Sequence, residues 1–174
     1  PYIFIPEDTA KERARVDRVP YIQWIEQKMI DATPGSRVDY DFVVEKLKWA
    51  KEFFDVREVQ FDGWNATQTV LILTAEGLPM VACPQTTKGY SAACKELEAL
   101  VATAQLNHGN HPVLRWQASN VAIKMDAAGN IMPAKDKATG RIDSIVALAM
   151  ALRGRSFAPV ETNFIYNDMG IYVG

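Results

Sequence analysis

Two aspartates stand where a carboxylate could hold a divalent cation. Asp62 directly follows a β-rich run at residues 57–61, and ligands of α/β folds usually meet the carboxyl ends of strands. Asp143 lies near the start of an apolar helical stretch at residues 142–152, where an ionised carboxylate is rare without a partner or a metal ion. Magnesium prefers oxygen ligands of this kind. Two metal ions bridged by carboxylates can activate water and stabilise the leaving oxygen in phosphodiester cleavage.

Each aspartate also has a structural interpretation. Asp62 suits the cap of a tight turn, because aspartate commonly initiates turns. Asp143 suits a helix N-terminus, where a negative charge contributes under about 1 kcal/mol. It could also pair with Arg141 or Lys137. Spacing alone leaves both interpretations open, and a shared metal site requires that the strand end and the late helix meet in the fold.

Other candidates for metal binding or nucleophilic catalysis are weaker. His108 and His111 have no third partner at zinc spacing, so a helix-terminating loop is the better interpretation. Cys83 and Cys94 form no CxxC motif, which argues against a disulfide framework or zinc site and favours a reduced, cytoplasmic setting. Ser91 and Cys94 lack a nearby base with an orienting partner. No GxxxxGK[ST] phosphate-binding motif occurs, so ATP hydrolysis is not expected.

The composition is that of one globular domain. The 174 residues are 48% hydrophobic and 23% charged, which is ordinary for a chain with a substantial core. The net charge of −2 gives no overall basic character, so DNA binding would require a local basic patch. No apolar run is long enough to cross a bilayer, and no signal peptide is recognisable. The strand-like segment directly after Pro1 indicates a fragment that starts inside a larger protein.

Hydrophobic periodicity predicts helices alternating with short strands. Helices are expected at residues 7–17, 20–29, 39–54, 67–76, 90–106 and 142–152. Strands are expected at residues 2–5, 57–61, 78–83, 113–116, 121–125 and 131–133, with a turn between the last two. The alternation favours an α/β layer fold with a central sheet. Residues 1–154 are expected to form one domain, and residues 155–174 an irregular C-terminal tail.

A set of short sequence words resembles the nuclease half of the large terminase subunits of tailed bacteriophages. Those around the two aspartates are Phe61-Asp62-Gly63-Trp64-Asn65-Ala66 and Gly140-Arg141-Ile142-Asp143. The others are Asp39-Tyr40-Asp41, Leu114-Arg115-Trp116, Ser119-Asn120, Gly129-Asn130-Ile131, Ile145-Val146-Ala147-Leu148 and the segment from Arg18-Val19-Pro20-Tyr21 through Thr33-Pro34-Gly35. They follow the family's order over residues 2–152, nearly the whole chain, and the ordered set is specific although no single word is.

The resemblance implies a ribonuclease H-like α/β fold, with a central mixed sheet flanked by helices and lacking its first strand in this fragment. It implies a metal-dependent endonuclease that cuts concatemeric double-stranded DNA through a two-metal site holding Mg²⁺ or Mn²⁺. Asp62 and Asp143 match the second and last of the family's three acidic metal ligands, which makes them the expected catalytic residues. The first acid would lie upstream of Tyr2, so the fragment alone is expected to bind metal poorly and to cut slowly or not at all.

The resemblance also implies partners. These are double-stranded phage DNA, the terminase small subunit, the portal protein and an N-terminal ATPase domain of the same polypeptide, all in the host cytoplasm and without a membrane. Lys135, Lys137 and Arg141 are expected to bind DNA phosphates beside the metals. Trp64 is expected to pack beneath the metal site and hold its loop.

Three alternatives stay open. Another ribonuclease H-like enzyme, such as a resolvase, would share the carboxylates. A non-catalytic phage assembly module would use both acids structurally. The basic residues also suit a solvated charged loop, since Asp126 and Asp136 are interspersed among them.

Overall fold

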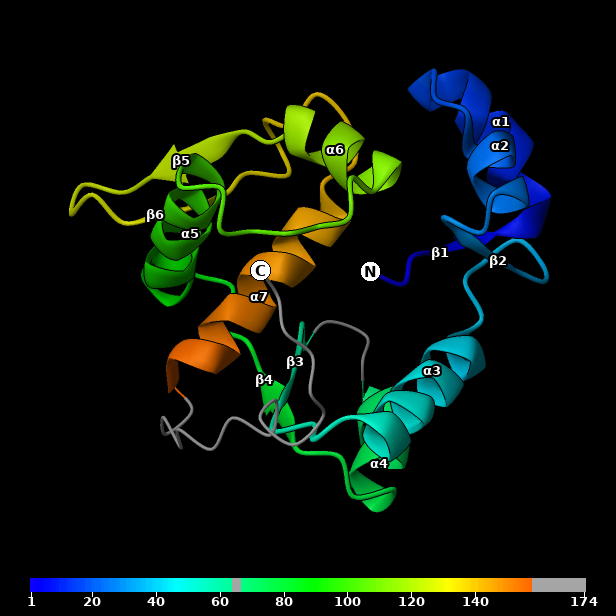
Figure 1. Cartoon of the computed structure of the whole chain (residues 1–174), viewed down its shortest axis with the longest axis horizontal. Helices are drawn as coiled ribbons and strands as arrows, with labels where there is room; N and C mark the ends of the chain where they lie inside the picture. The colour runs from blue at the N-terminus through cyan, green and yellow to red at the C-terminus, as the bar shows by residue number, and fades with distance from the viewer. Residues whose placement is uncertain (64–66, 158–174) are drawn as a thin grey trace, which may run out of the picture.

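The computed structural model describes residues 1–63 and 67–157, and within them it contains seven helices and six short strands (Figure 1). The helices are α1 (Glu7–Asp17), α2 (Tyr21–Glu26), α3 (Tyr40–Phe53), α4 (Thr67–Ala75), α5 (Thr87–Ala102), α6 (Pro112–Ser119) and α7 (Asp143–Phe157). The strands are β1 (Phe4–Pro6), β2 (Asp31–Thr33), β3 (Val59–Phe61), β4 (Met80–Ala82), β5 (Ile123–Met125) and β6 (Ile131–Pro133). The expected mixture of helices and strands is confirmed.

The strands pair two by two. β1 and β2 are parallel, with Phe4 opposite Asp31, and β3 and β4 are parallel, with Val59 opposite Met80. β5 and β6 form the expected antiparallel hairpin. The described residues thus contain both strand orientations in three separate two-stranded sheets, where the sequence indicated one central sheet. Each strand has only three residues, so helix packing rather than a continuous ladder holds these pairs in place.

One local expectation is wrong, and one strand was not anticipated. Residues 113–116 were expected to be extended but belong to helix α6. Pro112 occupies the first turn of α6, where its missing N–H costs nothing, and Val113, Leu114 and Gln117 form the buried face. Strand β2 was not anticipated, because three residues are too few for a periodic signal.

The core consists of three apolar clusters. The first lies among α1, α2, β1 and α6 and includes Trp24 and Val113. The second joins β4, α5 and α7 around Tyr90 and Ala149, both with 0% exposure. The third lies among α3, α4 and the β3–β4 pair, with Leu73 at its centre.

Helix α7 contacts α5, α6 and β3, and Figure 1 shows it (orange) running diagonally through the middle of the molecule. It continues past Gly154 to Phe157, so its last turn enters the segment that was expected to be irregular. Residues 158–174 lie outside the described residues, as does Trp64. In the described part of the chain, every helix is too short or too polar to span a membrane.

Asp126 anchors the β5–β6 hairpin to α5. Its carboxylate accepts hydrogen bonds from the Thr87 hydroxyl at 2.8 Å, from the Ala128 amide at 3.0 Å, and from the backbone and side chain of Asn130. These bonds favour the ionised form, and those from Asn130 contribute most. They lower the pKa of Asp126 to about 2. The hairpin and the first turn of α5 therefore share one carboxylate.

Replacing Asp126 by Ala should destabilise the domain in a pH-dependent way. Because the folded-state pKa lies below the unfolded value of about 3.9, the stabilisation is fully present above about pH 4 and is lost as the pH falls toward about 2. Urea unfolding near pH 6 and near pH 3 measures the difference between wild type and Asp126→Ala. That difference should shrink at the lower pH, and a difference independent of pH would contradict the assignment.

Candidate active site

The carboxylate of Asp143 is exposed at the start of helix α7. Its Oδ1 lies 3.1 Å from the ammonium of Lys135, with the two side chains 64% and 60% exposed. The structure therefore gives Asp143 a different partner from Arg141 or Lys137, the two basic residues considered from the sequence. Such an exposed pair contributes at most about 1 kcal/mol, so another cation can replace the lysine at small cost.

Lys135 is held close to Asp143 by the backbone that follows β6. The preceding residue, Ala134, is 1% exposed, and its amide donates to the Ala122 carbonyl at 2.8 Å. The Ala134 carbonyl accepts from the Lys137 amide at 3.1 Å, which forms a tight turn. The turn leaves the side chains of Lys135 and Lys137 at the surface.

Asp62 lies at the carboxyl end of β3 and is exposed. Its charge acts on the buried hydroxyl of Tyr90, whose pKa is raised first by burial and further by neighbours that include Asp62. The Tyr90 hydroxyl donates to Gln85 Oε1 at 3.2 Å. Asp62 thus lies at the edge of the cluster that contains Tyr90 and Ala149.

Strand β3 packs against α7. Its middle residue, Gln60, lies beside the end of the helix, where its Oε1 accepts from the Arg153 guanidinium at 2.8 Å. Its last residue, Phe61, accepts from the amide of Cys83, which belongs to the same buried cluster as Ala149 in the middle of α7. The carboxyl end of β3, which Asp62 follows, is therefore connected to the middle of α7 through Cys83.

The two acids offer the oxygen donors that a hard cation prefers, but fewer protein ligands than the three that the family resemblance implies. In residues 1–63 and 67–157, no three His, Cys, Asp or Glu side chains come together in a group that could hold a metal ion. Asp62 and Asp143 supply only oxygen donors, and magnesium is often bound by one or two carboxylates with water and phosphate as the other ligands. The two acids match that requirement.

Arg141 pairs with an acid of helix α1. Its Nε lies 3.7 Å from Asp17 Oδ2 of α1, which also accepts a 2.8 Å hydrogen bond from the Tyr21 hydroxyl. Burial, with the bond to Asp17, raises the pKa of Tyr21 well above its usual range. Arg141 therefore ties the loop before α7 to the first apolar cluster, a contact that the sequence did not indicate.

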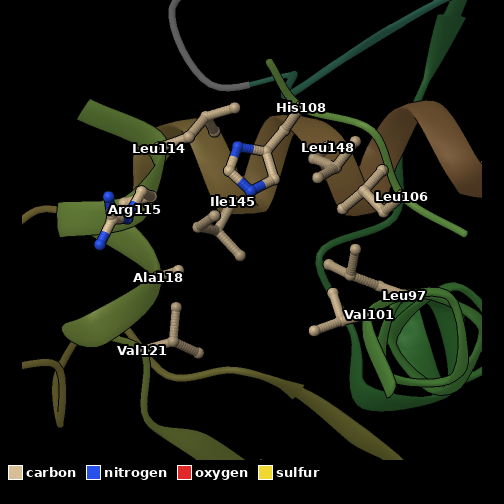
Figure 2. A pocket seen from close by; sticks show the side chains of 10 residues that line it. All are labelled: Leu97, Val101, Leu106, His108, Leu114, Arg115, Ala118, Val121, Ile145 and Leu148. Atoms are coloured by element: carbon tan, nitrogen blue, oxygen red, sulfur yellow. The ribbon is translucent and has the colours of Figure 1, made fainter. Parts of the chain in front are cut away.

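A cavity of about 380 Å³ lies between α5, α6 and α7, but it contains no carboxylate. Figure 2 shows the imidazole of His108 among apolar side chains such as Leu114, Ile145 and Leu148. Its polar lining is limited to His108 and Arg115, which gives it no resemblance to a phosphodiesterase centre. His111 directly precedes α6 at the N-cap position, without a capping side-chain hydrogen bond, and burial lowers its pKa.

The family assignment comes from comparison with known proteins. The family described as "Terminase large subunit, endonuclease domain" matches residues 1–157. This chain belongs to that terminase family. Among its relatives, the large terminase subunit of Enterobacteria phage HK97 is 39% identical over 170 residues, which cover 97% of this chain and 34% of the relative. Protein YmfN of Escherichia coli (strain K12) is 30% identical over 158 residues, covering 87% and 35%.

Solved terminase structures share the fold. The HK97 bacteriophage large terminase has a TM-score of 0.80 at 38% identity and covers 87% of this chain and 32% of that protein. The large terminase nuclease from thermophilic phage G20c has a TM-score of 0.52 at 22% identity, covering 67% and 63%. The terminase chain is therefore ribonuclease H-like, as expected from its sequence words. It spans about a third of the length of the curated relatives that it matches.

The pair Asp17–Arg141 should contribute measurably to the stability of this terminase domain. Asp17→Asn removes the charge but keeps an acceptor for Tyr21, so the free energy of unfolding should fall by roughly 0.5–1 kcal/mol. In an Arg141→Met background the same change should cost nothing further, because its partner is already gone. Urea unfolding of the two single variants and the double variant measures this. Equal losses in both backgrounds would show that Asp17 acts through Tyr21 alone.

Proposed function

We propose that this terminase domain hydrolyses phosphodiester bonds of double-stranded phage DNA with Mg²⁺ or Mn²⁺ bound between Asp62 and Asp143. The observation that carries the proposal is the course of β3, which leads from Gln60 beside Arg153 to Phe61, bonded to Cys83 of the cluster around Ala149. We infer that the exposed acid after β3 reaches toward the half of α7 that begins with Asp143. Family membership over residues 1–157 supports the reaction class.

Each of the two acids is attached to an element that is fixed by its neighbours. Asp62 ends a strand that is fixed to β4 and α7, and Asp143 starts a helix that is packed on three sides. Both carboxylates are solvent-exposed, so an ion and a phosphate can reach them from solvent. When bound, the metal ions activate water and stabilise the leaving oxygen. A third acid upstream of Tyr2, implied by the family resemblance, would complete the ligand set.

Lys135 has two roles in this proposal. In the metal-free domain its ammonium compensates the charge of Asp143. Because this exposed pair is weak, Lys135 would leave Asp143 easily if that carboxylate bound a metal ion. The lysine ammonium would then be able to contact a DNA phosphate. Lys137, exposed in the same turn, contributes a second phosphate contact. Arg141 is proposed as a third, at the cost of its weak pair with Asp17.

The whole protein's partners belong to the same proposal. The relatives are about three times as long as this chain, of which 97% aligns with 34% of the HK97 subunit. We assign the remaining functions, which are ATP hydrolysis and contacts to the small subunit and the portal, to other parts of the polypeptide. Assembly would take place in the host cytoplasm.

Asp62→Asn and Asp143→Asn should each reduce DNA cleavage by more than the roughly 10–100-fold that is typical when residues supporting a metal ligand are lost. Asp62→Asn should not lower the melting temperature in metal-free buffer, because removing one acid reduces repulsion. Asp143→Asn should lower it only slightly, because it removes a weak exposed pair with Lys135. Nicking of supercoiled plasmid with Mn²⁺, by this chain and by a version extended upstream, measures the activity. Asp136→Asn, an exposed acid beside Lys135, is the matched control and should cut normally. Lost stability with cleavage retained would favour the assembly-module alternative.

Lys137→Met should weaken DNA binding and its dependence on salt. Each phosphate contact that is lost makes the slope of log affinity against log salt shallower by about 0.9. Fluorescence anisotropy with a duplex, without divalent metal, measures the slope. Lys11→Met removes an exposed lysine from α1 and should leave it unchanged. An identical change in both variants would show that the net charge, not this turn, is responsible.

A further inference from the structure

Helix α7 begins without a capping side chain of its own. The first N–H groups of any helix have no partner within the helix, and a Ser, Thr, Asp or Asn before the first turn usually accepts from one of them. Here the preceding residue is Ile142, whose side chain has no acceptor and is 2% exposed. The start of α7, one of the two ends proposed to hold metal, therefore needs an acceptor from elsewhere.

Gln117 of α6 supplies that acceptor. Its side chain is buried at 5% exposure, and its Oε1 accepts from the amide of Ser144 at 2.6 Å. Twenty-seven positions separate these residues, so the bond is a tertiary contact rather than a local cap. A polar group buried at such a helix interface costs stability unless it is paired, which indicates a specific role for this contact.

Asn120, at the end of α6, holds the other side of Asp143. Its Nδ2 donates to the Arg141 carbonyl at 3.2 Å, and its Oδ1 accepts from the Thr139 hydroxyl at 3.2 Å. The Thr139 amide also donates to the Asn120 carbonyl. At Gly140 the approach is so close that a Cβ would lie 2.8 Å from Asn120 Nδ2. The loop at residues 139–141 is therefore held by hydrogen bonds and close packing to Asn120.

We infer that Gln117 and Asn120 are positioning residues that set the direction of the Asp143 carboxylate for metal binding. One acts on Arg141, two residues before the aspartate, and the other on Ser144, the residue after it. Fixing the backbone on both sides fixes the direction of the Cα–Cβ bond between them. Metal–ligand distances tolerate only about 0.2 Å, so a shift of this backbone weakens binding. The inference rests on the proposed function, since it takes Asp143 to be a ligand.

The test uses two readouts on this chain. Amide hydrogen exchange at Ser144 reports the cap itself. Broadening of the backbone NMR signals of residues 142–145 by Mn²⁺ reports metal binding and detects weak affinities, so it does not depend on cleavage. Gln117→Leu removes the acceptor, and Gln117→Glu restores one. Asn120→Ala tests the other side through exposed bonds that the fold does not require. Ser119→Ala is the control, because that hydroxyl bonds only to Trp116 in its own helix.

Gln117→Leu should speed Ser144 exchange and raise the Mn²⁺ midpoint by about threefold to tenfold. This increase is at or below the roughly 10–100-fold loss of metal affinity that is typical when a residue bonded directly to a ligand side chain is mutated. Asn120→Ala should raise the midpoint similarly, while Gln117→Glu and Ser119→Ala should stay near wild type. Gln117→Leu could instead speed Ser144 exchange and leave the Mn²⁺ midpoint unchanged, while Asp143→Asn raises that midpoint. The contact would then be a structural cap only, and the inference would be overturned. An unchanged midpoint in Asp143→Asn itself would overturn both the ligand assignment and the positioning role.

Discussion

One buried cluster joins Ala149 of α7, Tyr90 of α5 and Cys83, the residue after β4, and the arrangement of the candidate site depends on it. Ala149 is completely buried, and its small side chain lets the helix lie close to its neighbours. Strands of three residues cannot orient one another over a domain, so the direction of β3 is set by what packs on it. Because β3 packs on α7, the position of that helix decides where the exposed Asp62 lies relative to Asp143.

Electrostatics at this site depend on exposure rather than on net charge. The chain carries a net charge of −2, which gives polyanions no general attraction. Lys135 and Lys137 are nevertheless exposed in one turn beside Asp143, and the first neutralises that acid. An acid paired with a surface lysine remains accessible, whereas a buried pair would be costly to separate. The weakness of this pair is therefore compatible with exchange of one cation for another.

The sequence predicted most of the elements but not how the loop before α7 is held. Periodicity was sufficient for α3, α5 and α7, the charge pattern for α1, and the ordered set of sequence words indicated the family. Helix α6 was missed, because a short run with three apolar or aromatic residues, Val113, Leu114 and Trp116, looked extended after the proline. The face that carries Gln117 was therefore missed with it. The bond from Gln117 to Ser144 spans 27 positions, and no local pattern reports a contact of that range. The division into three small sheets also depends on contacts between distant segments.

Helix α6 contacts the first apolar cluster on one face and α7 on another, so it connects the N-terminal part of the chain to the candidate site. Trp116 packs beside Trp24 and Tyr21 in the first apolar cluster, with ring centroids 5.9 Å and 5.8 Å away. The next residue, Gln117, faces α7 and caps it. Since adjacent residues of one helix cannot move independently, a displacement of the first cluster would reach the start of α7. Arg141, paired with Asp17, joins the same two parts by a second connection. The backbone around the candidate metal ligand is therefore fixed by the first thirty residues as well as by the helices that surround it.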